Sequence, residues 1–457
     1  MMRFLQIAGW CLASTAAPAV AAEPAPAAQP REASQVELPQ FTVGQDESSQ
    51  FRGTDEKPIL AAVAAANKAG GGIVVIDAGT YRLAGGLRLA DVRNVHFKGL
   101  PGAVLELAPA VYAIAGESMP KGASTLRIAR SSGLAVGQTL RVLAPGAVDA
   151  FTGRPTNYFL ARIAGLERGR IRFAEPLPYE LREATQMLLL DSPNLFDIGR
   201  GCEGIHIADL TLDGGRRADD PPIPGHAERC GVYARSRYSY EKGLLEPPIV
   251  DVAVQGCTIR NCLGRGAAFY GVQFASVEDC TIVDTLDEAI DFDHFTRLGV
   301  ARRNKIARCR VGVELNDARE CVVEENEIAD CEVGLNLWRF CKLPGWNEKI
   351  AVARNRFDRI AGSAVVVGAD TTNNVFEFNE VRECGRVGFL VRGSGQQLTG
   401  NTVVRAGRQG IVVEGDACRI VRNRVLDASA EQNGKYDALV IEGTGHTSEG
   451  NDVMRRQ

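Results

Sequence analysis

An asparagine recurs at nearly regular intervals through the second half of the chain. Successive members of this series are 22, 29, 24, 22 and 22 residues apart. The series consists of Asn304, Asn326, Asn355, Asn379, Asn401 and Asn423. Most repeats also contain a glycine followed by alternating apolar residues, as in residues 312–315 and 334–337. A period of this size made of short alternating segments predicts a solenoid of β-strands, in which each repeat forms one turn of a coil.

The asparagine series and the strands that follow each glycine resemble the right-handed parallel β-helix of the pectin-lyase-like superfamily. The resemblance covers roughly residues 73–452, with one interruption. It implies an all-β fold class: a right-handed parallel β-helix with an N-terminal capping helix and a small inserted β-domain. Because this superfamily contains lyases, epimerases, hydrolases and binding proteins, the fold alone does not identify an activity.

Composition and turn residues divide the chain into parts. Residues 1–22 have a basic start, a short apolar run and small residues at their end, which predicts a secretory signal peptide and a periplasmic or secreted protein. Residues 23–45 are rich in Ala, Pro and Gln, as in a disordered linker. Residues 46–117 combine an Ala-rich helix, ended by three glycines, with the first turns. Residues 118–191 predict the inserted β-domain, and residues 192–457 the β-helix with a substrate groove.

Charge and cysteine usage narrow the possible partners. The net charge of −4 argues against a nucleic-acid binder, and no apolar run beyond the signal peptide is long enough to span a membrane. Cys262, Cys309, Cys331 and Cys384 share one column of the repeat, which favours buried free thiols over disulfides. No CxxC or His-rich motif predicts a zinc site. The sequence leaves the oligomeric state open.

Alternation places every second residue of a strand on the same face, so the aligned repeats give two outward columns. The first column is Tyr233, Ala268, Asp291, Glu314, Asn336, Val366, Leu390 and Val412. The second column is Arg235, Tyr270, Asp293, Asn316, Trp338, Gly368, Arg392 and Glu414. Polar residues end after Asn336 in the first column, so we expect a groove over the turns from Tyr233 to Trp338.

Three carboxylates are expected to crowd together in this groove. Strand spacing places Asp291, Asp293 and Glu314 within about 5 to 7 Å of one another. Crowding of this kind raises the pKa of some of the acids unless a cation intervenes. The three side chains are hard oxygen ligands that could hold Ca²⁺. Calcium-dependent pectate lyases place Asp and Glu ligands on successive turns in a similar way.

We expect an enzyme that processes an anionic, uronic-acid-containing polysaccharide. Arg235 or Ca²⁺ would neutralise the uronate carboxylate, and Tyr270 or His294 would remove the C5 proton as general base. Expulsion of the 4-linked sugar gives a lyase, whereas reprotonation from the other face gives a C5-epimerase. The predicted catalytic residues are Arg235, Tyr270, Asp291, Asp293, His294 and Glu314. The predicted substrate-binding residues are Tyr233, His226, Asn316, Asn336, Trp338 and Arg339.

Two other functions remain open from the sequence. A glycoside hydrolase would use two of the acids as a protonated and an ionised partner. A non-catalytic protein would bind polysaccharide in the same groove without turnover. The Asp-Pro-His-Asp motif of periplasmic alginate epimerases is absent, although residues 291–294 loosely resemble it, and the polygalacturonase motifs are also missing. Arg265, Arg297 and Arg302 are interpreted as solvated turn residues.

Overall fold

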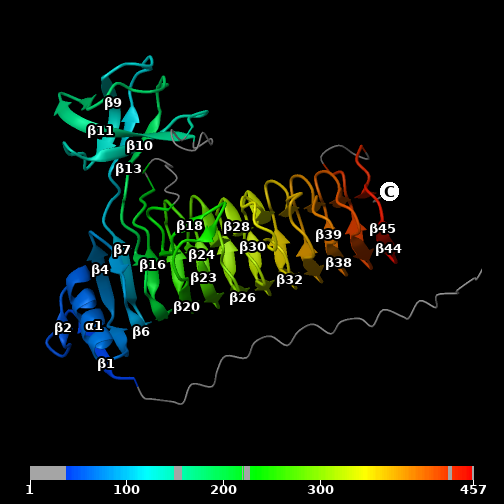
Figure 1. Cartoon of the computed structure of the whole chain (residues 1–457), viewed down its shortest axis with the longest axis horizontal. Coiled ribbons are helices and arrows are strands. Elements are labelled where there is room, and N and C mark those ends of the chain that lie inside the picture. The colour runs from blue at the N-terminus through cyan, green and yellow to red at the C-terminus, as the bar shows by residue number, and fades with distance from the viewer. Residues whose placement is uncertain (1–37, 149–156, 219, 221–226, 431–434, 455–457) are drawn as a thin grey trace, which may run out of the picture. The chain divides into compact units, whose positions relative to one another are not determined.

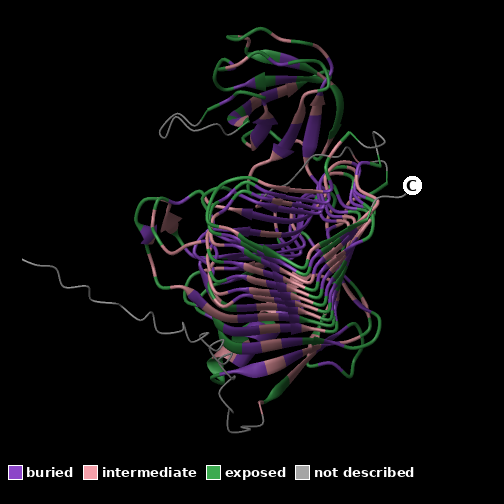
Figure 2. Ribbon diagram, turned by 90° about the vertical axis from the view of Figure 1, so that its right-hand side faces the viewer, coloured by how far each residue is buried: buried purple, intermediate pink, exposed green. Residues whose placement is uncertain are grey.

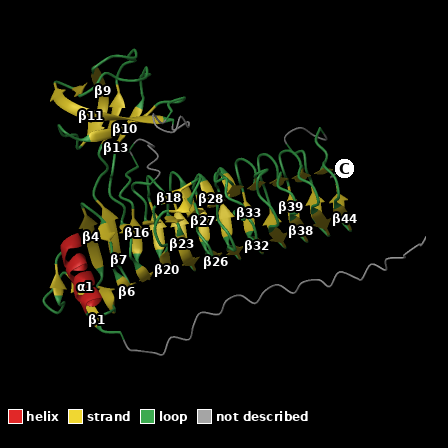
Figure 3. Ribbon diagram, in the orientation of Figure 1, coloured by secondary structure: helices red, strands yellow, loops and turns green. Residues whose placement is uncertain are grey.

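The structure is a computed structural model that describes residues 38–148, 157–218, 220, 227–430 and 435–454. The predicted signal peptide and His226 lie outside these residues. Three long parallel sheets form a coil, and the described residues contain a single helix, α1 (Figures 1 and 3). Among these residues, no helix has both the length and the apolar character needed to cross a membrane. The fold is the right-handed parallel β-helix that the sequence predicts.

Helix α1 (Glu56–Lys68) covers the first turn of the coil. The Asp55 side chain caps its N-terminus by accepting a hydrogen bond from the Lys57 backbone N–H at 3.0 Å. The helix buries one apolar face, which includes Ile59 and Val63, and contacts strands β1 (Gln40–Gly44) and β3 (Gly72–Ile76) of the first sheet. It therefore shields the apolar interior that the first turn of a solenoid would otherwise expose.

The first sheet has 14 strands. In sheet order they are β2 (Phe51–Arg52), β1 (Gln40–Gly44), β3 (Gly72–Ile76), β6 (Arg93–Gly99), β15 (Glu203–Ala208), β20 (Ile249–Gln255), β23 (Val272–Glu278), β26 (Val300–Arg302), β29 (Val322–Glu324), β32 (Ala351–Ala353), β35 (Val375–Glu377), β38 (Gln397–Thr399), β41 (Arg419–Val421) and β44 (Thr447–Glu449). Strand β1 lies inside the predicted linker 23–45. That prediction is wrong for residues 40–44, because β1 pairs in parallel with β3 and buries Val43 completely.

The second sheet has 12 strands. In sheet order they are β4 (Gly79–Leu83), β7 (Ala103–Leu107), β16 (Thr211–Asp213), β21 (Thr258–Arg260), β24 (Thr281–Val283), β27 (Lys305–Ala307), β30 (Glu327–Ala329), β33 (Arg356–Asp358), β36 (Glu380–Val381), β39 (Thr402–Val404), β42 (Arg424–Leu426) and β45 (Asp452–Met454). Its central positions point inward and stack one apolar residue per turn, as with Ile259, Ile282 and Ile306, all at most 1% exposed.

The third sheet has 11 strands and carries the predicted site. In sheet order they are β5 (Leu87–Leu89), β14 (Phe196–Ile198), β17 (Val232–Arg235), β22 (Ala267–Tyr270), β25 (Glu288–Asp293), β28 (Val311–Asn316), β31 (Val333–Trp338), β34 (Val365–Val367), β37 (Phe389–Val391), β40 (Ile411–Val413) and β43 (Leu439–Ile441). Figure 2 shows buried residues repeating in register along the strands of the coil.

The repeating asparagines form a buried ladder between the first and second sheets. The side-chain amide of Asn304 donates to Oδ1 of Asn326 at 2.9 Å, and that of Asn326 donates to Oδ1 of Asn355 at 2.9 Å. The same contact continues to Asn423. The residue before each asparagine has a positive φ, such as 54° at Arg303, so the side chain satisfies backbone groups left unpaired by a sharp turn. This role explains why asparagine recurs there.

A six-stranded antiparallel barrel interrupts the coil. Its strands are β8 (Tyr112–Ala115), β9 (Thr125–Ser132), β10 (Thr139–Leu143), β11 (Tyr158–Glu167), β12 (Arg170–Phe173) and β13 (Gln186–Leu189). It has an apolar core of its own, which includes Leu126, Leu140 and Ile171. The barrel starts at Tyr112, six residues before the boundary that the sequence suggested.

Candidate active site

The register of the third sheet confirms the first outward column. Tyr233 pairs with Ala268, Ala268 with Asp291, Asp291 with Glu314, and Glu314 with Asn336. The column continues through Val366, Leu390 and Val412. Toward the N-terminus it also includes Asp197 and Arg88, which the sequence reading did not reach. In the second column, the described pairs are Arg235 with Tyr270, Tyr270 with Asp293, and Asn316 with Trp338.

Asp291 lies at the centre of the site and is fully buried. Its Oδ2 atom accepts a hydrogen bond from the Tyr270 hydroxyl at 3.1 Å and lies 2.8 Å from Nε of Arg265. Its Oδ1 atom is shielded from solvent and has no hydrogen-bond partner in the described part of the chain. The side chain therefore has one oxygen that accepts two donors and one that the protein leaves unpaired.

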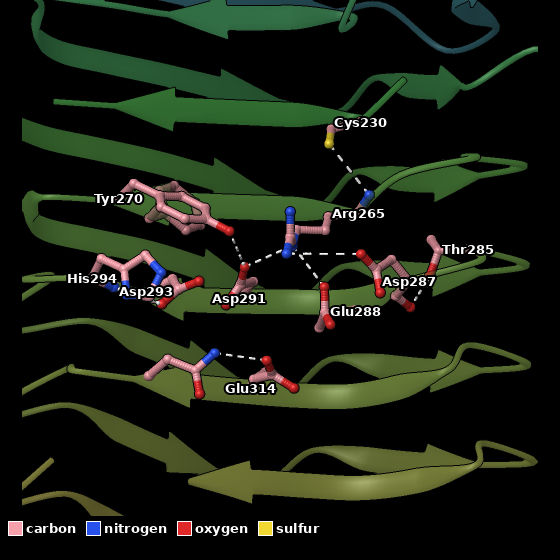
Figure 4. A network of polar contacts seen from close by, with 12 residues as sticks. Cys230, Arg265, Tyr270, Thr285, Asp287, Glu288, Asp291, Asp293, His294 and Glu314 are labelled. Carbon is pink, nitrogen blue, oxygen red and sulfur yellow. Dashed lines mark hydrogen bonds and ion pairs between the residues drawn. The ribbon is translucent and has the colours of Figure 1, made fainter. Parts of the chain in front are cut away.

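Arg265 corrects the sequence interpretation, which placed it in solvent. Its side chain is only 11% exposed and lies among three carboxylates (Figure 4). Nε of Arg265 is 2.6 Å from Oε2 of Glu288, and its guanidinium is 3.8 Å from Asp287. Arg310 approaches the same two acids from the next turn, with 2.6 Å to Asp287. Two guanidiniums thus face three carboxylates, which leaves one carboxylate without a full positive charge.

Asp291 is contacted by only one of the two guanidiniums, that of Arg265, whereas both contact Asp287 and Glu288. Burial raises the pKa of Asp291 well above the usual value, the neighbouring Asp293 raises it further, and Arg265 only partly opposes them. Burial also raises the pKa of Tyr270, against the opposing effect of Arg265. Tyr270 therefore keeps its proton at neutral pH, and burial favours the protonated form of Asp291. A proton on the Asp291 carboxyl would belong on Oδ1, because Oδ2 already accepts two hydrogen bonds.

His294 is a buried cation rather than a base. Its Nδ1 atom is 2.8 Å from Oδ1 of Asp293 and 3.0 Å from Oδ2 of Asp317, and its Nε2 atom is 3.0 Å from the Tyr240 hydroxyl. Burial lowers the pKa of His294, but the charges and hydrogen bonds of Asp293 and Asp317 outweigh burial and raise it to about 9. The expectation that His294 removes a proton does not fit this arrangement, since both ring nitrogens carry protons at neutral pH.

Glu314 is surrounded by amides instead of cations. Asn316 donates to its Oε1 atom at 2.7 Å, and Asn336 donates to its Oε2 atom at 3.2 Å. Glu314 is half-buried, whereas both asparagines are more than 90% buried. The amide oxygens of Asn316 and Asn336 have no hydrogen-bond partner among the described residues. These side chains thus present a carboxylate and two unpaired acceptors on neighbouring turns.

An aromatic hairpin covers the site. It consists of β18 (Tyr238–Ser239) and β19 (Gly243–Leu244), with Tyr240 between them. The Tyr238 ring lies 4.8 Å from the His294 ring and 6.2 Å from the Tyr270 ring, measured between centroids. The Tyr233 ring, 6% exposed, packs on Tyr270 at 5.4 Å. The hairpin therefore covers the part of the predicted groove around Tyr270 and His294.

Three further predicted residues lie at the margin of the site. Arg235 is exposed, with its guanidinium 5.8 Å from the centre of the Tyr238 ring. Trp338 is half-buried and lies over Gly368, where an added Cβ would come within 3.1 Å of the indole. Arg339 donates to backbone carbonyls, including that of Cys341 at 3.2 Å. It stabilises its own loop, and its charge is not directed at the acidic residues.

The carboxylates do not fit the expected calcium site. Arg265 occupies the side of Asp291 where a cation would bind, His294 pairs with Asp293, and two amides hold Glu314. In the part of the chain that the structure describes, no group of three or more His, Cys, Asp or Glu side chains is arranged to hold a metal ion. The 11 described cysteines are all buried free thiols.

The chain resembles several known proteins. The family described as "Periplasmic copper-binding protein (NosD)" matches residues 250–454. No curated protein matches the chain in sequence. Among solved structures, the A-module of the Azotobacter vinelandii mannuronan C-5 epimerase AlgE6 is 15% identical with a TM-score of 0.51, covering 88% of this chain and 95% of that one. The AlgE4 A-module is 14% identical with a TM-score of 0.52, covering 87% and 93%. At this level of identity the likeness establishes the fold.

Proposed function

We propose that this protein is a periplasmic or secreted enzyme that acts on a uronic-acid-containing polysaccharide by removing the proton at C5, next to the carboxylate. A lyase and a C5-epimerase share this first step. The fold relatives named as mannuronan C-5 epimerases support the substrate class, and the matching family described as periplasmic supports the location. The predicted signal peptide agrees with that location.

The environment of Asp291 carries the proposal: the carboxyl is fully buried, its Oδ1 atom is unpaired among the described residues, and its pKa is raised by burial. Removing a proton next to a carboxylate builds negative charge on the carboxylate oxygens, so the enzyme must offer hydrogen-bond donors there. A carboxylic acid kept neutral by burial, next to a tyrosine, is an arrangement that enzymes use to stabilise enolates. Asp291 has this form, with Oδ1 unpaired and Oδ2 fixed by Tyr270 and Arg265. In the proposed complex, the Oδ1 proton binds the uronate carboxylate.

Glu314 is the base in this proposal. It is the register partner of Asp291 on the next turn, about 4.8 Å away along the sheet. Its two oxygens are oriented by Asn316 and Asn336 rather than neutralised by an arginine. In the proposed complex, Glu314 accepts a proton and Asp291 donates one from the adjacent position. Because Tyr270 and His294 are both protonated, Glu314 replaces them as the expected base.

The margin of the site supplies the contacts that a polymer needs. Arg235 offers an exposed guanidinium for a second uronate carboxylate, and the Trp338 indole offers a flat surface for a sugar ring. The unpaired amide oxygens of Asn316 and Asn336 suit sugar hydroxyl donors. Since the hairpin 238–244 covers Tyr270 and His294, substrate entry requires this hairpin to move.

Glycoside hydrolysis fits the same residues less well. Glycosidases separate their two carboxyl groups by about 5 to 5.5 Å or about 6.5 to 9.5 Å. The backbones of Asp291 and Glu314 lie about 4.8 Å apart on adjacent turns. Asp293 is further along the strand, but it is held by His294. Because Arg265 and Tyr270 hold Asp291 while two amides hold Glu314, we favour donation and abstraction at one carbon over attack across a glycosidic bond.

The test is to incubate the mature protein with polymannuronate, polyguluronate, polygalacturonate, glycosaminoglycans and neutral glucans, with and without a chelator. Ultraviolet absorbance, reducing ends and the sugar composition are followed together. Absorbance that rises with new ends shows a lyase, and a changed uronate composition without new ends shows an epimerase. New ends without absorbance would overturn the proposal in favour of hydrolysis. Binding without any change in the polymer would overturn it in favour of a carbohydrate-binding protein.

A further inference from the structure

The hairpin 238–244, which is not part of the three parallel sheets, also brings Tyr240 to the site. The Tyr240 hydroxyl lies 3.0 Å from Nε2 of His294, and Nδ1 of His294 lies 3.0 Å from Oδ2 of Asp317. Asp317 is fully buried, and its other oxygen accepts the backbone N–H groups of Phe340 and Cys341 at 2.8 and 2.9 Å. The result is a continuous chain of hydrogen bonds from the loop 340–341 to the Tyr240 phenol.

The backbone supports this arrangement at an energetic cost. His294, Phe295 and Asp317 have φ angles of 24°, 73° and 51°, in a region that such residues rarely adopt. Positive φ angles recur at the turns of this coil, as at Arg303 before the asparagine ladder, and each turn fixes the direction of its side chain. The turn after β25 thus holds the imidazole at a fixed angle between Asp317 and Tyr240.

The direction of the hydrogen bonds follows from charge. His294 lies between Asp293 and Asp317 and carries protons on both nitrogens. The imidazolium therefore donates to the Tyr240 oxygen, and the phenol proton points away from the ring. When Tyr240 gives up this proton, the phenolate faces a positive charge only 3.0 Å away. The contact between His294 and Tyr240 therefore favours release of the phenol proton and stabilises the phenolate that remains.

We infer that Tyr240 is the general acid of the proposed reaction, with His294 and Asp317 as positioning residues. In the first step, which rests on the proposed function, the C5 proton moves to Glu314 and the C5–H electron pair enters the carboxylate as an enediolate. In the second step of a lyase, that pair forms the C4–C5 double bond, the C4–O4 bond breaks, and O4 takes the proton of Tyr240. In an epimerase, C5 takes this proton from the other face. The phenolate is reprotonated from water, and Glu314 returns its proton to water.

The neighbouring tyrosines do not fill this role. Tyr270 already donates its proton to Asp291 and comes from the sheet, as Glu314 does. Tyr240 comes from the hairpin and is half-buried, so it reaches the substrate from a different element. An acid and a base on separate elements are what proton transfer at opposite faces of one ring requires.

The experiment uses Tyr240→Phe, which keeps the ring and removes the proton. We expect kcat for product formation to fall about 10²- to 10⁴-fold with KM changed less than threefold. Exchange of the C5 proton into D₂O, which needs only Glu314, should persist and exceed product formation. His294→Gln should show the same separation of exchange from product. Tyr436→Phe removes a phenol hydroxyl near the end of the coil and serves as the control with normal turnover.

Two results would overturn the inference. Tyr240→Phe that forms product at the normal rate would exclude the hydroxyl from the reaction. Equal loss of exchange and product in a folded variant would make Tyr240 part of the base step or of substrate binding. Failure of the proposed function looks different, because the wild-type protein would then show no C5 exchange with any polyuronate.

Discussion

Asp291 and Glu314 are register partners on β25 and β28, yet Asp291 is fully buried beside an arginine and Glu314 is half-buried between two amides. Asp291 is fully buried, and its pKa is raised by that burial and by Asp293. Glu314 is half-buried, and its oxygens accept hydrogen bonds from two amides. In the proposed reaction, a single step along the coil therefore separates the proton donor from the proton acceptor. This difference in environment is the basis of the proposed chemistry.

Two substitutions of Asp291 distinguish a role as a neutral proton donor from a role as a charged carboxylate. A neutral acid at this position predicts that Asp291→Asn retains activity within about tenfold of wild type, because the amide nitrogen can donate where Oδ1–H does and the amide oxygen can accept from Tyr270 and Arg265. Asp291→Ala removes the donor and should lower kcat about 10²- to 10³-fold. Steady-state kinetics of both variants are measured on the polyuronate that the wild-type protein modifies. An Asn variant as inactive as the Ala variant would show that a charged carboxylate is needed.

The raised pKa of His294 predicts a pH-dependent stability. The imidazole has a pKa of about 9 in the folded chain and about 6.5 when unfolded, so folding binds its proton more tightly. The stabilisation is fully present below about pH 6.5 and is lost as pH rises through about 9, with a size of about 3 kcal/mol. Denaturant unfolding from pH 6 to 10 measures it. His294→Gln lacks the group and should lack this component, and equal slopes in the two proteins would contradict the assignment.

Removing the Arg265 guanidinium should lower the free energy of unfolding more than removing that of a surface arginine. Arg265→Gln leaves Asp287 and Glu288 buried with Arg310 as their remaining cation, so we expect a loss of about 3 to 5 kcal/mol in the free energy of unfolding. Arg297 forms a pair with Glu320 at 2.7 Å, but its side chain is 45% exposed. Arg297→Gln should cost less than about 1 kcal/mol. Similar losses in the two variants would mean that Arg265 is as well solvated as the sequence suggested.

The asparagine ladder should contribute to stability without affecting chemistry. Asn326→Ala removes the side-chain donors to Asn355 and Ala301 and the acceptor for the Asn304 backbone N–H. Leaving these buried groups unpaired should cost about 3 kcal/mol or more. Asn261→Ala, outside the ladder and half-buried, should cost about 1 kcal/mol. Thermal unfolding compares them, and catalytic activity measured well below the transition should be normal in both. A ladder variant as stable as Asn261→Ala would refute this role.

The sequence predicted the features that the regular repeat determines. A fixed repeat and strict alternation determine which residues face outward, so the column from Tyr233 to Asn336 and the buried cysteines could be read directly. The acidic cluster on adjoining turns followed from the same rule. The spacing of the repeat also identified the fold, because few architectures tolerate short parallel strands at this period.

The features that the sequence missed all depend on turns and loops. Arg265 precedes β22 in a turn, and alternation does not say whether a turn residue points to solvent or back over the sheet. Tyr240 lies in a hairpin with no repeat to align it, so its contact with His294 had no signal in the sequence. The partnership of Asp317 with His294 depends on a positive φ at both residues. Without Arg265 and the pairing of His294 with Asp317, the cluster looked like a calcium site and His294 looked like a base.

The most direct test of the account is the exchange of the C5 proton in D₂O. The wild-type protein is incubated with the polyuronate that it modifies, and the H5 signal is followed by NMR beside Glu314→Gln and Glu414→Gln. Glu414 directly follows strand β40 of the same sheet and pairs with Arg392, outside the site. The account predicts deuterium at C5 with the wild type and the Glu414 variant, and a rate about 10²- to 10⁴-fold lower with Glu314→Gln. Product formed with H5 fully retained, or unchanged exchange in the Glu314 variant, would contradict it.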